Sequence, residues 1–212
     1  MKRALIVWGG WEGHEPKQVA EILAAALCDE GFEVEVADSL DAFRDEEKLR
    51  GLDLIVPEWT MGQIEREQLQ PLLAAVKGGV GIAGLHGGMG DAFRQETEFQ
   101  FMVGGQWVAH PGGAGVTYTV EIVKPEDPIV AGIDDFEVTS EQYYMHVDPN
   151  NEVLAVTRFP DYGDAPVPVV WKKMYGQGRV FYSSLGHSAA TVAQREVLTI
   201  MTRGMKWAAR AL

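Results

Sequence analysis

The chain has 212 residues, a length that suits one domain with a sizeable hydrophobic core, here taken as residues 1–212. Lysine and arginine number 18 and aspartate and glutamate 31, which gives a formal net charge of −13. This acidity argues against a nucleic-acid partner and against an anionic membrane surface, because both bind cationic faces. The apolar start ends at Gly9-Gly10, too early for a signal peptide, and no apolar run is long enough to span a membrane. A single cysteine, Cys28, allows no intrachain disulfide, so we expect a soluble protein of the reducing cytoplasm and leave a homo-oligomer open.

The first half of the chain alternates between strand and helix patterns. Apolar or alternating runs predict strands at residues 3–8, 32–36, 52–56 and 80–85. Helical spacing predicts helices around residues 19–27, 65–77 and 91–103, with a short charged helix at 41–50. This alternation predicts a mostly parallel sheet covered by helices on both faces, which is a flavodoxin-like three-layer α/β sandwich.

The second half is richer in strands. Strand patterns cover residues 116–122, 136–144 and 152–158, and residues 167–174 and 179–184 flank the hairpin signal Tyr175-Gly176-Gln177-Gly178. A final helix is expected at about 189–209. We therefore expect an antiparallel extension of the parallel sheet.

The five histidines all follow or precede predicted strands in loop-like contexts: His14, His86, His110, His146 and His187. Loops at the carboxyl ends of parallel strands share one edge of an α/β sheet, where ligands bind. His14 and His86 should therefore converge, and we expect His187 and His110 to face the same cleft.

The segment Gly84-x-His86-x-Gly88 has the spacing of a nucleophile elbow, a sharp strand-to-helix turn that presents its middle side chain above the sheet. The middle residue is a histidine, where acyl transfer would need a serine or cysteine. Cys28 lies inside a predicted helix and is expected to be a packing residue, so glutaminase chemistry is not expected. In such an elbow, His86 should stand at the mouth of a cleft with few buried contacts.

The histidines admit two chemical roles. Neutral imidazole is a good ligand for zinc and other divalent metals, and His14, His86 and His110 are the candidate ligands. No local zinc motif such as H-E-x-x-H occurs, so a metal site would be assembled from separate loops. Alternatively, histidine itself transfers protons, and His86, His187 and Glu141 are the candidate catalytic residues.

A second polar cluster, Ser140-Glu141-Gln142-Tyr143-Tyr144, lies at a predicted strand end. A glutamate beside tyrosines can bind sugar hydroxyls while the rings pack on the sugar face. Trp11, Trp59 and Tyr143 are therefore candidate substrate-binding residues. The glycine pairs at 104–105 and 112–113 lack the dinucleotide fingerprint, so no nucleotide cofactor is predicted.

These motifs, taken in order, resemble the ThuA-like (trehalose utilisation) family. The matching pieces are His14 after the first strand, Gly84-Leu85-His86, residues 101–107 leading to His110-Pro111, residues 127–133, Glu141-Gln142-Tyr143, residues 176–182 with Leu185-Gly186-His187, and Trp207. The resemblance implies a class I glutamine amidotransferase-like fold without the amidotransferase cysteine. It also implies a role in the breakdown of disaccharides such as trehalose or of their 3-keto derivatives.

The chain departs from the family pattern at two places. Glu126-Asp127-Pro128 stands where His-Pro is common, and Ser140-Glu141 stands where Asp-Glu is common. Two functions remain open at this point. One is an enzyme, a hydrolase, lyase or isomerase acting on a sugar through its histidines. The other is a non-catalytic module that binds a sugar or a partner protein on the same scaffold.

Overall fold

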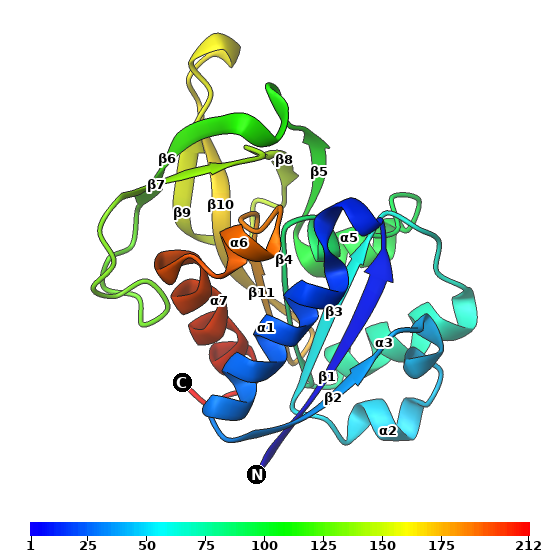
Figure 1. The fold of residues 1–212 in the computed structure, drawn as a ribbon. Coiled ribbons are helices and arrows are strands. Elements are labelled where there is room, and N and C mark those ends of the chain that lie inside the picture. The colour runs from blue at the N-terminus through cyan, green and yellow to red at the C-terminus, as the bar shows by residue number, and fades with distance from the viewer.

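The computed structural model describes residues 1–212 and contains one large sheet of nine strands in the order β2-β1-β3-β4-β11-β10-β9-β6-β7 (Figure 1). Its first part is parallel and comprises β1 (Lys2–Gly10), β2 (Phe32–Ala37), β3 (Leu54–Thr60), β4 (Gly81–Leu85) and β11 (Gly178–Ser183). The remaining strands join antiparallel: β10 (Pro166–Tyr175), β9 (Glu152–Arg158), β6 (Val116–Ile122) and β7 (Phe136–Ser140). The expected parallel sheet with an antiparallel extension is confirmed.

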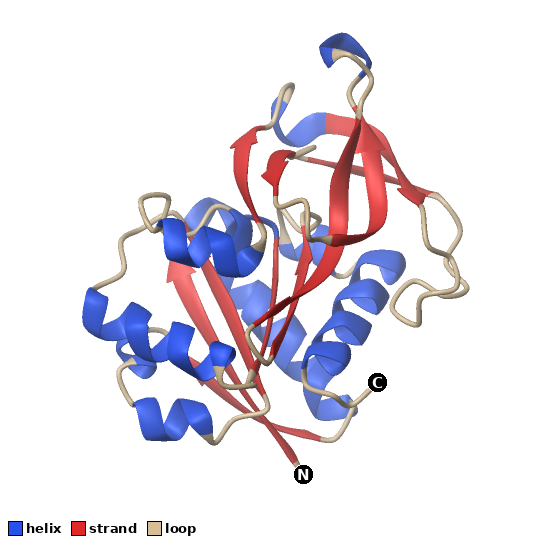
Figure 2. Ribbon diagram, turned by 180° about the vertical axis from the view of Figure 1, so that it is seen from behind, coloured by secondary structure: helices blue, strands red, loops and turns tan.

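Helices cover both faces of the parallel part (Figures 1 and 2). One face carries α1 (Pro16–Asp29) and α7 (Arg195–Ala208), and the other carries α3 (Arg66–Lys77) and α5 (Thr97–Val103). Strand β1 shows why, because Ala4 and Ile6 pack into one apolar cluster and Leu5 and Val7 into the other. Burial on both faces explains the continuous apolar runs of these strands.

Smaller elements complete the chain. They are the short helices α2 (Glu46–Arg50), α4 (His86–Gly90) and α6 (Ala189–Val192), the two-stranded sheet of β5 (Gly105–Ala109) and β8 (Tyr144–Val147), and the 3-10 turns η1 (Glu12–His14), η2 (Leu40–Phe43), η3 (Gly113–Gly115) and η4 (Pro160–Tyr162). None of the helices combines the length and the apolar character that a membrane span requires.

Several predicted boundaries need correction. Of the helix expected at 91–103 only α5 forms, from residue 97 on, and a separate short helix, α4, begins earlier at His86 itself. The strand expected at 136–144 is broken after Ser140, and the final helix is interrupted at residues 193–194. Cys28 is exposed, so its expected packing role is wrong; it lies on the solvent face of α1, next to the buried Leu27.

Candidate metal centre

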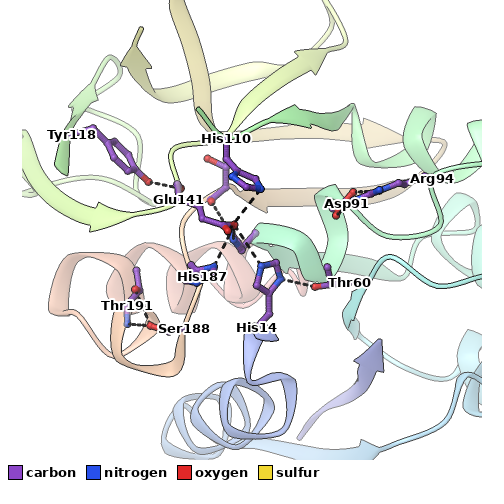
Figure 3. Close-up of polar contacts among 12 residues, drawn as sticks. His14, Thr60, Asp91, Arg94, His110, Tyr118, Glu141, His187, Ser188 and Thr191 are labelled. Carbon is purple, nitrogen blue, oxygen red and sulfur yellow. Dashed lines mark hydrogen bonds and ion pairs between the residues drawn. The ribbon is translucent and has the colours of Figure 1, made fainter. Parts of the chain in front are cut away.

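Four loops meet at the carboxyl edge of the parallel strands, and each brings one polar side chain to the same point (Figure 3). His14 ends η1 after β1, His86 begins α4 after β4, and His187 lies between β11 and α6. Glu141 comes from the turn between β7 and β8. One ligand atom from each of these four residues lies within 4.8 Å of the others. The strand ends therefore collect three imidazoles around one carboxylate.

The loop after β1 is held tightly against the end of β3. Gly10 approaches Thr60 so closely that a Cβ at Gly10 would lie 2.2 Å from the Thr60 carbonyl oxygen, and the Trp11 N–H donates to that oxygen at 3.2 Å. The Glu15 carboxylate accepts a hydrogen bond from the Ala189 N–H at 2.8 Å, which ties this loop to α6 beside His187. These contacts position His14 with its Nδ1 2.8 Å from the Thr60 hydroxyl.

The turn at His86 has the strained geometry of an elbow. His86 has a φ of 45°, in the left-handed region that non-glycine residues seldom adopt. A Cβ at Gly84 would lie 2.5 Å from Met89, and a Cβ at Gly88 would lie 2.3 Å from the Glu58 carboxylate. Both glycines of the motif are therefore required by close packing around the turn.

The expectation that few buried contacts hold His86 is wrong. Its side chain is 1% exposed, and its ring stacks on Tyr143 with the ring centroids 3.9 Å apart. The reason is the segment between β7 and β8, which folds back over the elbow and covers the side chain that a bare elbow would present to solvent.

Glu141 lies close to all three histidines of the centre. Its Oε2 lies 3.2 Å from His86 Nε2, 3.3 Å from His187 Nδ1 and 3.6 Å from His14 Nε2. Burial raises the pKa of Glu141, but the imidazoles that surround it lower it by more, so the net pKa lies below its usual value. The carboxylate is therefore ionised at neutral pH.

The proton on His86 is placed by its other ring nitrogen. Nδ1 lies 2.8 Å from the Ser184 carbonyl oxygen, which can only accept, so Nδ1 carries the hydrogen. Burial lowers the pKa of His86 to about 4, against smaller effects that raise it, so the ring is neutral at neutral pH. Its Nε2 then presents a lone pair to Glu141 Oε2. Two lone pairs facing each other at 3.2 Å repel, and a cation between them would satisfy both.

The same need for a cation appears at the other two rings. His14 Nε2 and His187 Nδ1 are buried and have no hydrogen-bond partner within the protein. Buried polar atoms without partners are rare in folded proteins, and each one calls for a physical reason. Because both atoms face Glu141, one bound ion would supply the missing partner for all three imidazoles.

The donor set and its spacing fit a transition metal. Three imidazole nitrogens and a carboxylate oxygen are ligands that zinc and its neighbours accept. With metal–ligand bonds of about 2.0–2.1 Å in tetrahedral geometry, ligand atoms lie about 3.3 Å apart. The distances of 3.2, 3.3 and 3.6 Å from Glu141 to the three histidines match this value.

His110 lies beside the centre and outside its innermost ring. Its Nε2 is 3.8 Å from Glu141 Oε1, the carboxylate oxygen that faces away from the other histidines, and its side chain is 36% exposed. The loop after β5 therefore brings His110 to the cleft, as the sequence analysis expected. His187 occupies the position among the ligand atoms that was assigned to His110. His146, by contrast, is exposed on β8.

The three aromatic residues assigned to substrate binding have different surroundings. Trp11 is 45% exposed with its ring 4.7 Å from that of His14, and it borders the centre on the solvent side. Tyr143 is buried behind His86. Trp59 packs against Gly9 and Gly62, and a Cβ at Gly9 would lie 2.4 Å from its ring. Only Trp11 and Tyr143 contact residues of the centre.

Some residues that support the centre were missed by the sequence analysis. Thr60 and the Ser184 carbonyl orient His14 and His86, and such partners of metal-binding histidines fix their tautomers. Asp91 binds Arg94 through two hydrogen bonds, and that guanidinium lies over the ring of Trp107 next to His110. For Thr60 a signal existed, because it follows a predicted parallel strand, as His14 and His86 do.

Residues 3–208 match the family ThuA, described as trehalose utilisation. The chain belongs to this family. Among solved structures, a ThuA-like protein from Bacteroides uniformis ATCC 8492 is similar with a TM-score of 0.80 and 18% identity, over 98% of this chain and 91% of that one. A ThuA-like protein from Parabacteroides merdae ATCC 43184 has a TM-score of 0.78 and 19% identity, over 98% and 90%.

A cytoplasmic protein from Salmonella typhimurium LT2 is similar with a TM-score of 0.71 and 14% identity, over 97% of this chain and 99% of that one. No match was found among curated proteins. At these identities the structural likeness establishes the ThuA fold, and the chemistry must be argued from the site itself.

Proposed function

We propose that this ThuA-family protein is an enzyme of carbohydrate utilisation that acts on a disaccharide or its 3-keto derivative at a metal centre. His14, His86, His187 and Glu141 would hold one divalent transition metal, zinc or a close neighbour. The observation that carries the proposal is the neutral His86, whose Nε2 lone pair faces the Glu141 carboxylate at 3.2 Å. Membership of a trehalose-utilisation family supports a sugar as the substrate.

A bound divalent metal would act as a Lewis acid on a sugar carbonyl or hydroxyl. The protein's own groups would place and deprotonate the sugar. His110 is half-exposed at the open side of the centre, where its imidazole can accept a proton from substrate. Trp11, exposed beside His14, offers an aromatic face to the C–H groups of a sugar ring.

A 3-keto sugar suits these groups because the ketone acidifies the hydrogen on C2. When a base such as His110 takes that proton, the electrons of the C2–H bond form a C1–C2 double bond. The C1–oxygen bond then breaks, and the departing oxygen takes up a proton. Deprotonation at the same carbon without bond cleavage would lead to isomerisation.

The test measures metal content and turnover together. The protein is purified without chelators, its metals are determined by elemental analysis, and turnover of 3-keto-trehalose is followed with and without added divalent ions. Glu141→Gln keeps the shape of the side chain but removes its charge, and Glu137→Gln, exposed on β7, is the matched control. We expect near one metal per chain in the wild type and in the control.

In Glu141→Gln, we expect metal content to fall at least about tenfold and turnover at least about 100-fold. If the wild type carries no metal and gains no turnover from added ions, the metal centre is wrong. If it binds sugars without turning any over, the protein is a binding module on this scaffold. A cytoplasmic location remains a prediction.

A further inference from the structure

A groove of about 630 Å³ lies next to the metal centre, where two strands of the antiparallel extension separate. Strand β6 pairs with β9 only through Glu121 and Ile122, although its other edge pairs with β7 from Val116 to Val120. From Val120 back to Val116, β6 has no pairing with β9, and the groove occupies the space between the two strands. The tip of the β9–β10 hairpin, yellow at the top of Figure 1, rises beside it.

The groove shares its wall with the metal centre. Tyr118, which lines it, donates a hydrogen bond from its hydroxyl to the backbone carbonyl of Glu141 at 3.3 Å. Gln142, the next residue, donates to the Thr157 hydroxyl at 2.7 Å and to the Arg158 carbonyl at 2.9 Å. Pro111, directly after His110, also lines the groove. The groove therefore begins at the residues that directly follow His110 and Glu141 in the chain.

Its lining combines an aromatic platform with hydrogen-bonding groups. Tyr162 is 58% exposed on η4, with its ring 6.4 Å from that of Phe159. Thr119 and Gln142 line the groove, and Arg158 binds the Glu121 carboxylate through Nε at 3.0 and 3.3 Å. Within the protein, Arg158 donates hydrogen bonds only from Nε and from Nη1, so its remaining N–H groups can donate to a ligand. A sugar presents both a C–H face and hydroxyl groups, and this lining matches both.

The charges around the groove exclude an anionic ligand. Glu121 and Asp161 line it, and the Asp164 carboxylate lies 3.8 Å from Arg158 Nη1. Arg158 is the one cation of the lining and is already paired with Glu121. A phosphorylated or acidic sugar would meet net negative charge here, so the groove suits an uncharged sugar better than an anionic one.

We propose that this groove is a second sugar subsite, which holds one neutral glycosyl unit of a disaccharide while the other ring lies at the histidine centre. This assignment rests on the proposed function and narrows its substrate to unphosphorylated disaccharides. It also gives the residues around η4 a role in selecting disaccharides over single sugars. Tyr162 is the residue through which the subsite can be tested, because its exposed ring makes few contacts that the fold needs.

The experiment follows backbone amide signals of the full chain by NMR during titration with trehalose, glucose and trehalose 6-phosphate. We expect trehalose to shift the amides of Gly112, Thr157 and Tyr162 and to bind at least about tenfold more tightly than glucose. Tyr162→Ala should remove most of that difference, because the exposed ring is the aromatic platform of the groove. Met174→Ala, equally exposed on β10 outside the groove, should leave trehalose binding unchanged.

Unchanged trehalose affinity in Tyr162→Ala, or no shifts at the groove, would overturn the subsite. Tighter binding of trehalose 6-phosphate than of trehalose would overturn the assignment of a neutral ligand. The same titration of Glu141→Gln separates this proposal from the proposed function. If trehalose still shifts the groove amides while Glu141→Gln keeps full turnover, the subsite stands and the metal-dependent chemistry fails.

Discussion

Two buried carboxylates lie close to the turn that carries His86, and their surroundings give them opposite states. Glu141 is surrounded by imidazoles, which lower its pKa. Glu58 precedes Thr60 by two residues on β3 and therefore shares its face of the strand. Its carboxyl group lies against Gly88, and its Oε2 has no hydrogen-bond partner. Burial raises the pKa of Glu58 well above its usual value, which favours the protonated carboxyl.

The contrast shows what sets the ionisation state of a buried carboxyl group in this protein. Both carboxyl groups are buried, with Glu58 2% and Glu141 6% exposed, so burial by itself does not decide the charge. The neighbouring groups decide it, because polar and charged groups stabilise an ionised carboxylate and an apolar setting stabilises a neutral carboxyl group. Glu141 therefore sits among imidazoles on one side of the turn, whereas Glu58 sits in close packing against Gly88 on the other.

The largest effect on metal affinity and on stability should follow from removing the side chain of His86. His86→Ala deletes a ligand, a ring stacked on Tyr143 and the hydrogen bond to Ser184. We expect metal affinity to fall more than about 100-fold and the free energy of unfolding of the metal-free protein to fall by about 2–4 kcal/mol. Urea unfolding with chelator measures the second effect. His146→Ala, exposed on β8, is the control and should change it by less than about 0.5 kcal/mol. Equal stability of the two variants would contradict the buried role of His86.

On the packing side, Gly88→Ala should destabilise through a clash alone. Gly88 has no positive φ, so the backbone tolerates alanine, but the new Cβ would lie 2.3 Å from the Glu58 carboxylate. We expect a loss of about 2 kcal/mol in the free energy of unfolding. Gly115→Ala, with nothing within 4 Å of its Cβ position, is the matched control. A Gly88→Ala variant as stable as the control would show that Glu58 moves away freely.

A smaller effect on metal affinity is expected at Thr60. This residue is related to both carboxyl groups, because it lies on the same strand as Glu58 and contacts His14, a neighbour of Glu141. Thr60→Val keeps the shape but removes the hydroxyl that lies 2.8 Å from His14 Nδ1. Loss of such an outer partner should weaken metal binding about tenfold. Competition with a coloured chelator measures the affinity. Thr60→Ser retains the hydroxyl and should bind metal as the wild type does; equal weakening in both variants would exclude the hydrogen bond as the cause.

The smallest effect concerns the pH dependence caused by Glu58. Because its folded pKa is raised above the unfolded value of 4.5, the unfolded chain releases this proton at lower pH than the folded protein does. Stability from this group is therefore complete below about pH 4.5 and is lost as the pH rises toward the folded pKa. Glu58→Gln removes this pH-dependent loss of stability, so the stability advantage of the variant over the wild type should grow by about 1 kcal/mol between pH 5 and pH 6.

Urea unfolding at several pH values checks this prediction. Glu67→Gln, exposed in the first turn of α3, should follow the wild type at every pH. Parallel pH profiles for Glu58→Gln and the wild type would show that Glu58 is ionised in the folded protein and that the contrast with Glu141 is wrong.

The β–α alternation of the first half could be predicted from the sequence, because apolar periodicity is local. The strand at 152–158 and the hairpin around residues 175–178 were predicted at nearly their observed bounds for the same reason. The convergence of His14 and His86 also followed from the sequence, since both follow parallel strands and such strands end at one edge. The resemblance to ThuA-like proteins anticipated the family that the match to residues 3–208 shows.

Tertiary structure alone decided how the centre is completed. Glu141 reaches His86 across 55 positions of sequence and His86 reaches Ser184 across 98, through strand pairings that no local pattern encodes. The packing of these distant segments also buried His86. It placed His187 beside His14, His86 and Glu141 and left His110 next to this group, on its exposed side. Strand ends are set by short-range periodicity, whereas the partners of a buried polar atom depend on which distant segments pack over it.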